Sequence, residues 1–190
     1  MRIVGGARRG LRLADVGAGD AAARLRPTSD RVRESLFNLL AHGGYGDPVP
    51  GARVLDLFAG TGALGLEALS RGAAHAAFVE TGRPALALLR ENLRRLGAEA
   101  EAWVIERDAT RPGRCPGAPF DLVFLDPPYG LGLGARALAA AREGGWIAPG
   151  ALVAWEEAAG AAPAPPPGLT LLDARRYGGT MVSLLRSHPE

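Results

Sequence analysis

Short runs of strand-forming apolar residues alternate with amphipathic segments over most of the chain. The run FDLVFL at residues 120–125 is apolar except for Asp121, which is typical of a strand buried on both faces of a parallel sheet. Further apolar runs predict strands at residues 54–58, 76–80, 102–106 and 151–156. Helices are predicted between strands at residues 63–70, 83–96 and 135–142. The alternation predicts an α/β fold in which a mostly parallel sheet carries helices on both faces.

The end of the sequence departs from this alternation. Residues 169–175 and 181–185 are strand-like and flank Tyr177-Gly178-Gly179-Thr180. Two strand-like runs around a short glycine-containing segment predict a hairpin, so the sheet should finish with an antiparallel strand. The turn itself could border a binding site or could simply reverse the chain.

The first residues also differ from the central part. Glycine-separated apolar pieces in residues 1–26 predict a small β-hairpin extension. A helix is predicted at residues 30–40, and its core-facing stripe is Val32, Leu36, Leu39 and Leu40. We therefore divide the chain into a basic N-terminal β extension (1–26), a helix and linker (27–51) and the main domain (52–190).

Arginine is concentrated at the start of the chain. Residues 1–34 hold eight arginines against four carboxylates, a net charge of +4, which leaves −2 for the remainder. The chain has no lysine. Arginine forks suit phosphate oxygens, so this end is a candidate contact for nucleic acid, although an ordinary solvated surface explains the charge equally well.

Other compositional features narrow the class of protein. With 190 residues, 47% of them hydrophobic, the chain can bury one substantial core, so we expect one main domain. Cys115 is the only cysteine, which excludes an intrachain disulfide and argues against a cysteine-based metal site. We expect no metal and no role for Cys115. No run reaches the ~18 apolar residues of a membrane span, and we expect a cytoplasmic protein with no membrane partner.

The strand at residues 120–125 ends abruptly at Asp126-Pro127-Pro128-Tyr129. Two consecutive prolines remove two backbone donors and fix two φ angles, so no sheet ladder continues through them. The result is a stiff turn that presents a carboxylate, free carbonyls and an aromatic ring. Ligand crevices of open α/β sheets form at this carboxyl end of the strands, which makes the turn a candidate site rather than a plain strand terminator.

A second candidate is the glycine-rich turn after the first strand. It contains the spacing Gly60-x-Gly62-x-x-Gly65, and Glu80 ends the next predicted strand. Alone, this spacing is a passable dinucleotide fingerprint, with Glu80 on a ribose. It is weak evidence, because glycines at a strand-to-helix turn also serve close packing.

Asp56 discriminates between ligands for this turn. In a dinucleotide site the pyrophosphate rests on the turn, where positive potential is favourable. A carboxylate about 4 Å from a phosphate charge would cost roughly 4 kcal/mol at an effective dielectric of ~20. S-adenosylmethionine instead presents an ammonium and a sulfonium, so Asp56 becomes favourable.

Acidic residues lie at the ends of four strands: Asp56, Glu80, Asp108 and Asp126. Together they predict a cleft for a cation, with Glu80 on the ribose hydroxyls and Asp108 accepting from the adenine amino group. The expected cofactor contacts are Asp56, Phe58, Ala59, Gly60, Thr61, Gly62, Glu80, Thr81, Asp108 and Ala109.

These motifs resemble a known family. The pair Asp56-x-Phe58-x-Gly60-x-Gly62 and Asp126-Pro127-Pro128-Tyr129 resembles the seven-strand S-adenosylmethionine-dependent amino-methyltransferases. The blocks RIVGG at residues 2–6, LRPTSDRVRESLFN at 25–38 and GALGLEALSRGA at 62–73 resemble the bacterial guanine-N2 methyltransferases of small-subunit (16S) ribosomal RNA. The resemblance covers essentially the whole chain, least at residues 10–24 and 157–168. It implies a Rossmann-like seven-stranded sheet and a role in rRNA processing.

The resemblance implies catalytic roles for Asp126, Pro127, Pro128 and Tyr129. Hydrogen bonds from an exocyclic amino group to Asp126 and the Pro127 carbonyl would aim its lone pair at the methyl group. Tyr129 would stack on a base that has been flipped out of its helix. The methyl group would then move by in-line displacement, with no covalent enzyme intermediate.

The resemblance also implies that the basic N-terminal segment meets small-subunit ribosomal RNA, either naked or in the assembled 30S particle. The implied RNA contacts are Arg2, Arg8, Arg9, Arg12, Arg26, Thr28, Arg31 and Arg33. Arg31 and Arg33 are expected away from the core, and Thr28 and Arg31 are alternatively an ordinary helix cap and a surface arginine.

Competing functions stay open at this point. The Asp-Pro-Pro-Tyr motif also suits methylation of adenine or cytosine in DNA, although 190 residues leave little room for a separate sequence-reading domain. Protein glutamine methylation uses similar geometry. An NAD-dependent oxidoreductase would have to accommodate Asp56, and a non-catalytic RNA-binding module would not need a complete cleft.

Overall fold

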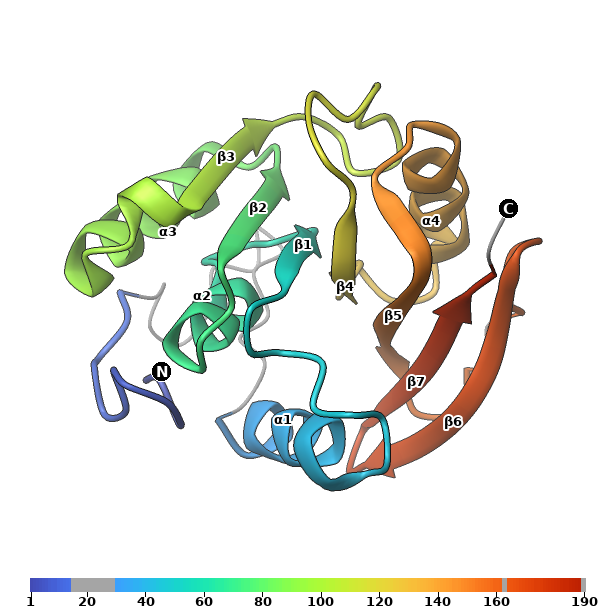
Figure 1. The fold of residues 1–190 in the computed structure, drawn as a ribbon, viewed down its shortest axis with the longest axis horizontal. Helices are drawn as coiled ribbons and strands as arrows, with labels where there is room; N and C mark the ends of the chain where they lie inside the picture. The colour runs from blue at the N-terminus through green and yellow to red at the C-terminus, as the bar shows by residue number, and fades with distance from the viewer. Residues whose placement is uncertain (15–29, 162–163, 189–190) are drawn as a thin grey trace.

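A computed structural model describes residues 1–14, 30–161 and 164–188. The strands are β1 (Arg53–Leu57), β2 (His75–Glu80), β3 (Ala102–Glu106), β4 (Phe120–Leu125), β5 (Ile147–Ala158), β6 (Leu169–Tyr177) and β7 (Thr180–Ser187). They form one seven-stranded sheet in the order β3-β2-β1-β4-β5-β7-β6 (Figure 1). The first five strands are mutually parallel, and β7 runs antiparallel to both β5 and β6. The Rossmann-like, mostly parallel sheet expected from the sequence is confirmed.

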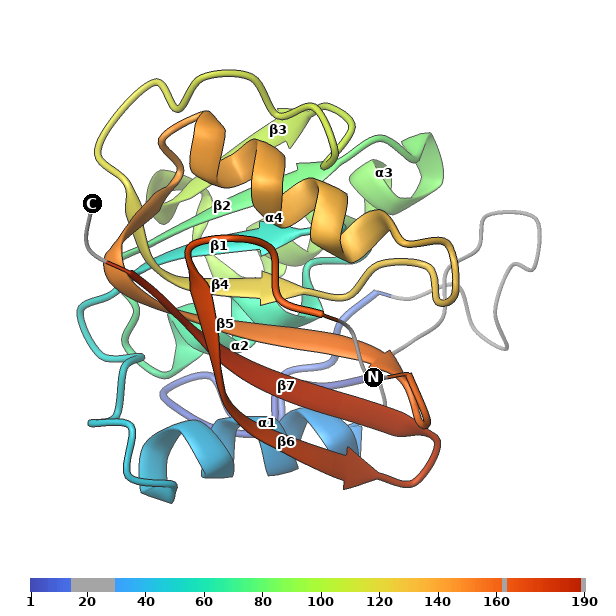
Figure 2. The same ribbon diagram turned by 90° about the vertical axis from the view of Figure 1, so that its right-hand side faces the viewer.

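The described helices are α1 (Asp30–His42), α2 (Ala63–Ser70), α3 (Arg83–Leu96) and α4 (Leu133–Glu143), with a 3-10 turn at Glu99–Glu101. The core residues of α1, α2 and α3 pack on one face of the sheet, and those of α4 pack on the other. Figure 2 shows α4 crossing in front of β1 and β4, with α1 on the far side of the sheet. None of the helices in the described ranges is long and apolar enough to span a membrane.

Several strand boundaries differ from the pattern-based expectation, and the end of β1 and the start of β5 have a local cause. β1 ends at Leu57 because Phe58 has a φ of 62°, which a strand cannot accommodate. β5 begins at Ile147, earlier than expected, and its pairing with β4 shifts register between Phe120 and Leu122. Such an irregularity lets a stretch that contains proline and glycine enter a ladder without continuous alternation.

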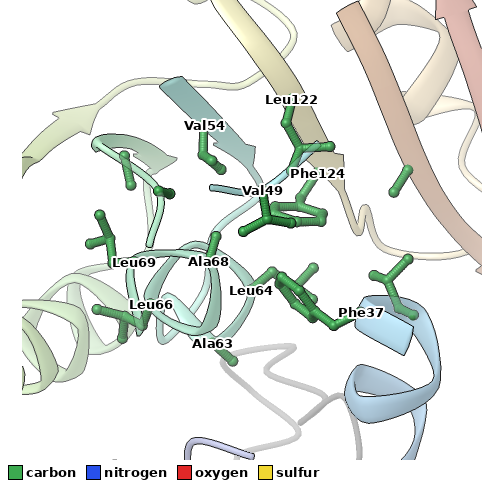
Figure 3. Packing of buried hydrophobic residues seen from close by; sticks show 14 of the residues in the cluster. Phe37, Val49, Val54, Ala63, Leu64, Leu66, Ala68, Leu69, Leu122 and Phe124 are labelled. Atoms are coloured by element: carbon green, nitrogen blue, oxygen red, sulfur yellow. The ribbon is translucent and has the colours of Figure 1, made fainter. Parts of the chain in front are cut away.

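The larger core lies between the sheet and helices α1 and α2 (Figure 3). The rings of Phe37 on α1 and Phe124 on β4 lie 5.4 Å apart at an interplanar angle of 48°. Aromatic pairs in this tilted arrangement add about 0.5–1.5 kcal/mol to their burial. Helix α1 therefore belongs to the same packed unit as the strand that precedes Asp126.

The N-terminal arm (residues 1–14) packs on the same face. It folds back through an antiparallel bridge between Arg2 and Arg12, and Ile3 N donates to Leu11 O at 2.9 Å. Ile3 and Leu13 are buried in the core. This geometry agrees with the small hairpin expected from the sequence.

A buried ion cluster holds the arm against α1 and α2. The Glu67 carboxylate contacts Arg33 at 3.5 Å and Arg71 at 2.7 Å, and it also accepts a bond from Val4 N at 2.8 Å. Arg33 itself donates to Asp30 and to the carbonyl of Arg2. Because the side chains of Arg33 and Glu67 are fully buried, their charges depend on this cluster for compensation.

The expectation that Arg33 points outward and contacts RNA is therefore wrong. Its guanidinium has no exposed surface and is committed to Glu67, Asp30 and the arm. Residue 33 lies on the buried face of α1 with Leu36, Phe37 and Leu40. The charge of its side chain led the sequence analysis to place it on the exposed face.

Replacing Glu67 with glutamine should lower the free energy of unfolding by about 3–5 kcal/mol, because Arg33 and Arg71 would lose the buried carboxylate that they share and Arg33 would keep only the partly exposed Asp30 as a counter-charge. Urea denaturation checks this. The matched control is Glu91→Gln on the exposed surface of α3, which should leave the unfolding midpoint unchanged. Equal midpoints for both variants would contradict the structural role of the cluster.

Candidate functional site

The candidate site lies at the carboxyl edge of the sheet, where β1 and β4 are neighbours. The chain leaves β1 towards β2 and later returns on its other side as β4, which makes this the switch point of the topology. The four carboxylates predicted at strand ends belong to four neighbouring strands of the sheet. In the spatial order β3, β2, β1 and β4 they are Asp108, Glu80, Asp56 and Asp126. The structure thus brings them to one edge, as their sequence positions predicted.

The turn between β1 and α2 is tightly constrained. Gly62 precedes α2 with a φ of 82°, a conformation that favours glycine, and its N–H donates to Ala59 O at 2.7 Å. A side chain at Gly65 would collide with the ring of Phe78 on β2. The glycine spacing therefore allows the sharp turn and lets α2 approach the sheet closely.

Phe58 is a strained residue in the same turn. Its φ of 62° is uncommon for a residue that is not glycine and costs on the order of 1–3 kcal/mol. The neighbouring Ala59 N donates to Val79 O at 3.1 Å, which ties the turn to β2. Strain of this kind concentrates at functional sites, in agreement with the place of the turn in the fold.

Asp56 lies beneath this turn rather than on its surface. Only 2% of the residue is exposed, and its Oδ2 accepts a bond from Gly65 N at 2.9 Å. Burial raises the pKa of Asp56 well above its ordinary value, the Gly65 bond opposes this, and Asp126 and Glu80 raise the pKa further. The site therefore contains a buried carboxyl group whose charged form would need a nearby positive charge to be stable.

Glu80 supports the turn from the adjoining strand. One carboxylate oxygen accepts from Gly60 N at 2.8 Å, and the other accepts from Thr81 N and Gly82 N at 2.7 Å each. The side chain thus organises two turns at once. Since a carboxylate has about four acceptor positions, one remains for a further donor.

Asp108 follows β3 in an exposed position. Its Oδ1 accepts from both the N–H and the hydroxyl of Thr110, each at 2.8 Å. These bonds, with Arg111 and Arg136 nearby, lower the pKa of Asp108. Asp108 is therefore ionised at neutral pH, and the adjacent Ala109 is buried beneath it.

The proline turn is fixed through its last residue. The Tyr129 hydroxyl donates to Glu156 Oε1 at 3.2 Å and lies 3.4 Å from Thr180 Oγ1. Burial is the main reason that the pKa of Tyr129 is raised, and Glu156 and Asp126 add to it. Glu157 accepts from Gly130 N at 3.3 Å and so holds the next residue. The aromatic ring is consequently held by β5 and β7.

Sequence reasoning missed several of these supporting residues. Glu156 and Glu157 are buried carboxylates at the end of an apolar strand, a signal that could have been found. Thr180 was considered only as part of a turn that could border the site, and it does border Tyr129. Asn92 carries no sequence signal, because its bonds to the Thr61 carbonyl and to Ala14 depend on how α3 packs.

The expected RNA contacts are distributed unevenly. Arg9, Arg12 and Arg31 are exposed, and Arg2 is exposed beside Asp30. Arg8 is half-buried, and its Nε donates to the carbonyl of Leu96 at 2.9 Å. Arg26 and Thr28 lie outside the described residues. Across the described ranges, no group of three or more His, Cys, Asp or Glu side chains could hold a metal ion.

Comparisons with known proteins agree with this geometry. A family model described as Conserved hypothetical protein 95 matches residues 1–186. "Ribosomal RNA small subunit methyltransferase D" of Escherichia coli (strain K12) is 42% identical over 153 residues, covering 80% of this chain and 72% of that protein. The Haemophilus influenzae protein of the same name is 37% identical over 158 residues, covering 80% and 76%. The solved structure of Escherichia coli yhhF has a TM-score of 0.82 at 36% identity, covering 100% of this chain and 99% of that one.

The buried position of Asp56 generates a prediction about stability. In the Asp56→Asn variant the amide oxygen can still accept from Gly65 N, but the cost of burying a charge is removed. Above the folded pKa of Asp56, the variant should therefore melt a few degrees higher than wild type.

The pH dependence of this difference has a defined sign. The folded pKa of Asp56 lies above its unfolded value, so the folded wild type takes up a proton as the pH falls and gains stability. The advantage of Asp56→Asn should be full above the folded pKa and vanish near the unfolded value of ~3.9. Thermal melts of wild type and variant over a series of pH values test the idea, and a difference that does not grow in favour of the variant as the pH rises would refute it.

Proposed function

The chain belongs to the Conserved hypothetical protein 95 family, and from this premise we propose that it methylates the exocyclic N2 of a guanine in small-subunit ribosomal RNA, with S-adenosylmethionine as donor. The observation that carries the proposal is the joining of two parts at one sheet edge. One part is a glycine-rich turn held by the carboxylates of Asp56 and Glu80, and the other is the Asp-Pro-Pro-Tyr turn. Relatives that align over 80% of the chain are named as small-subunit ribosomal RNA methyltransferases, which supports the substrate and a cytoplasmic place of action.

The acidic edge fits a cationic donor. Asp56 is buried, and burial disfavours its charged form, so an ammonium or sulfonium above the turn would favour ionisation of the carboxyl group by offsetting that cost. The fourth acceptor position of Glu80 suits a ribose hydroxyl, and the ionised Asp108 suits an adenine amino group. The same carboxylates would repel the negative charge of a pyrophosphate, which disfavours a dinucleotide as the ligand.

S-adenosylmethionine supplies an electrophilic methyl group on a positively charged sulfur. The protein's task is then to make an amide-like nitrogen nucleophilic. Asp126 and the carbonyl of Pro127 are the two acceptors proposed to bind the hydrogens of the amino group and to draw its lone pair out of the ring. Two prolines in succession keep both acceptors in place, so little reorganisation is needed in the transition state.

Tyr129 is proposed to stack on the flipped base. Its ring cannot rotate away easily, because the hydroxyl is bound to Glu156 and lies beside Thr180. A preorganised aromatic face offsets part of the few kcal/mol needed to unstack a base. This arrangement suits any planar base, so the tetrapeptide alone does not separate guanine from adenine or cytosine.

The choice of RNA rests on the arm and on the relatives. Arg9, Arg12 and Arg31 remain exposed for phosphate contacts, whereas Arg33 is removed from the proposed set by its burial. Arg2 and Arg8 remain in the set, although each already contacts the protein through Asp30 or Leu96.

Cofactor binding can be tested without the nucleic acid. S-adenosylmethionine and its demethylated product should both raise the melting temperature of the protein, because they bind the folded state alone. NAD at the same concentration should leave it unchanged. Stabilisation by NAD together with indifference to S-adenosylmethionine would assign the pocket to a dinucleotide and end this proposal.

Activity is tested with Asp126→Ala and a matched carboxylate control. The variant should lose methyl transfer while its affinity for S-adenosylmethionine stays within about tenfold, since Asp126 is proposed to hold the nucleophile. Glu143→Ala, at the exposed end of α4, should retain full activity.

The substrate is identified in the same assay. Tritiated S-adenosylmethionine is offered to naked ribosomal RNA, 30S particles, DNA and protein, and the labelled product is digested to nucleosides. Label in N2-methylguanosine from either RNA sample supports the proposal. Label in DNA bases or in glutamine would replace it with another substrate class.

A further inference from the structure

The N-terminal arm contacts the C-terminal end of helix α3, between Asn92 and Leu96. At one end Arg8 Nε donates to Leu96 O at 2.9 Å, and at the other Ala14 N donates to Asn92 Oδ1 at 2.6 Å. Between these points Arg95 Nη1 approaches the carbonyl of Arg12 at 3.5 Å. The arm and α3 therefore present one continuous surface.

This surface carries more positive charge than the arm alone. Arg9 and Arg12 are exposed on the arm, and the side chains of Arg94 and Arg95 are 65% and 42% exposed on α3. Their one acidic neighbour in the described contacts is Glu91, which pairs with both Arg94 and Arg95. The four arginines thus exceed the local negative charge by three.

Asn92 fixes this surface relative to the site. It is fully buried, and its Nδ2 donates both to Ala14 O at 3.1 Å and to Thr61 O at 3.0 Å. Thr61 belongs to the glycine turn between β1 and α2. One amide side chain therefore joins the arm, α3 and the proposed cofactor turn, so that a ligand on the basic surface is held in register with the site.

We propose that the arm and α3 form a single RNA-docking surface, here called the α3 docking surface (Arg9, Arg12, Arg94 and Arg95), that binds the phosphate backbone next to the flipped nucleotide. The inference rests on the proposed function for its choice of RNA. It adds α3, which no sequence motif singled out, and it assigns Asn92 as the positioning residue that aligns the surface with the site. Arginine forks match phosphate oxygens, and each contact of this kind contributes to binding without reading sequence.

Salt dependence tests the surface directly. Filter binding measures the affinity of the protein for small-subunit ribosomal RNA transcribed in vitro, over a series of KCl concentrations and without cofactor. Each lost phosphate contact should make the slope of log K against log salt shallower by about 0.7–0.9. The Arg94→Gln/Arg95→Gln variant should therefore flatten the slope by about 1.5 and lower affinity about tenfold at low salt.

The matched control removes two arginines from the opposite side of the sheet. Arg114 lies in the loop before β4 and Arg142 on α4, which covers the other face. The Arg114→Gln/Arg142→Gln variant has the same net charge as the α3 variant and should keep the wild-type slope. If the control flattens the slope and the α3 variant does not, RNA docks on the other face and the proposal is overturned. Arg94→Gln alone, with half the effect, serves if the double variant does not fold.

Asn92→Asp separates positioning from binding. Aspartate can still accept from Ala14 N, but it can donate neither to Ala14 O nor to Thr61 O. The variant should keep the RNA affinity and its salt slope, while kcat for methyl transfer falls at least tenfold and the KM for RNA changes little. Unchanged kcat would overturn the positioning role, and duplex DNA bound as tightly as RNA with the same slope would overturn the choice of partner.

The outcomes distinguish this inference from the proposed function. The salt experiment measures binding alone, so a dependence on Arg94 and Arg95 would stand even if no methyl transfer to RNA were found. Conversely, a chain that methylates RNA with an unchanged salt slope in the α3 variant would keep its function and lose this docking surface.

Discussion

The arrangement of the site depends on one constraint, the hydrogen bonding of the turn between β1 and α2 to two carboxylates. Asp56 holds the turn from below through Gly65 N, and Glu80 holds it from the side through Gly60 N. Backbone N–H groups at the start of a helix ordinarily favour an anion. Here the protein has already supplied its own negative charges, so the remaining preference of this edge is for a cation. The cost is a buried carboxylate and a strained Phe58, both tolerated because α2 and β2 pack tightly around them.

The two halves of the sheet contribute different features to this carboxyl edge. On the β1–β3 side, short polar side chains shape a binding surface from backbone groups. On the β4–β7 side, the stiffness comes from the covalent ring of proline and from the contacts of Tyr129 with neighbouring strands. Because β1 and β4 are hydrogen-bonded neighbours, the two halves cannot shift independently. A donor bound on one side and a nucleophile bound on the other would therefore meet at a fixed distance.

Much of this could be predicted from the sequence, and the reason is local. Apolar runs, glycine spacing and the consecutive prolines depend on neighbouring residues, so the strand and helix order and the four strand-end carboxylates were predictable. Arg33, Asn92 and Thr180 were not, because their roles arise from contacts with residues distant in the chain. Arg33 was also misread: charge is normally a sign of exposure, and only the partner Glu67 on another helix reverses that inference. The buried pair Glu156 and Glu157 lies between these cases, since two carboxylates ending an apolar strand are visible but their partners are not.

The contact between Tyr129 and Thr180 has a consequence for how the protein is made. β7 is translated after every other strand of the sheet, yet it lies between β5 and β6. During synthesis β1 to β5 can pair with one another before β7 is made, whereas β6 cannot yet pair with β7, its neighbour in the sheet. The Tyr129 hydroxyl then lacks the neighbouring Thr180 until β7 pairs between β5 and β6. The described position of the Tyr129 side chain is therefore complete only after β7 has paired with both β5 and β6.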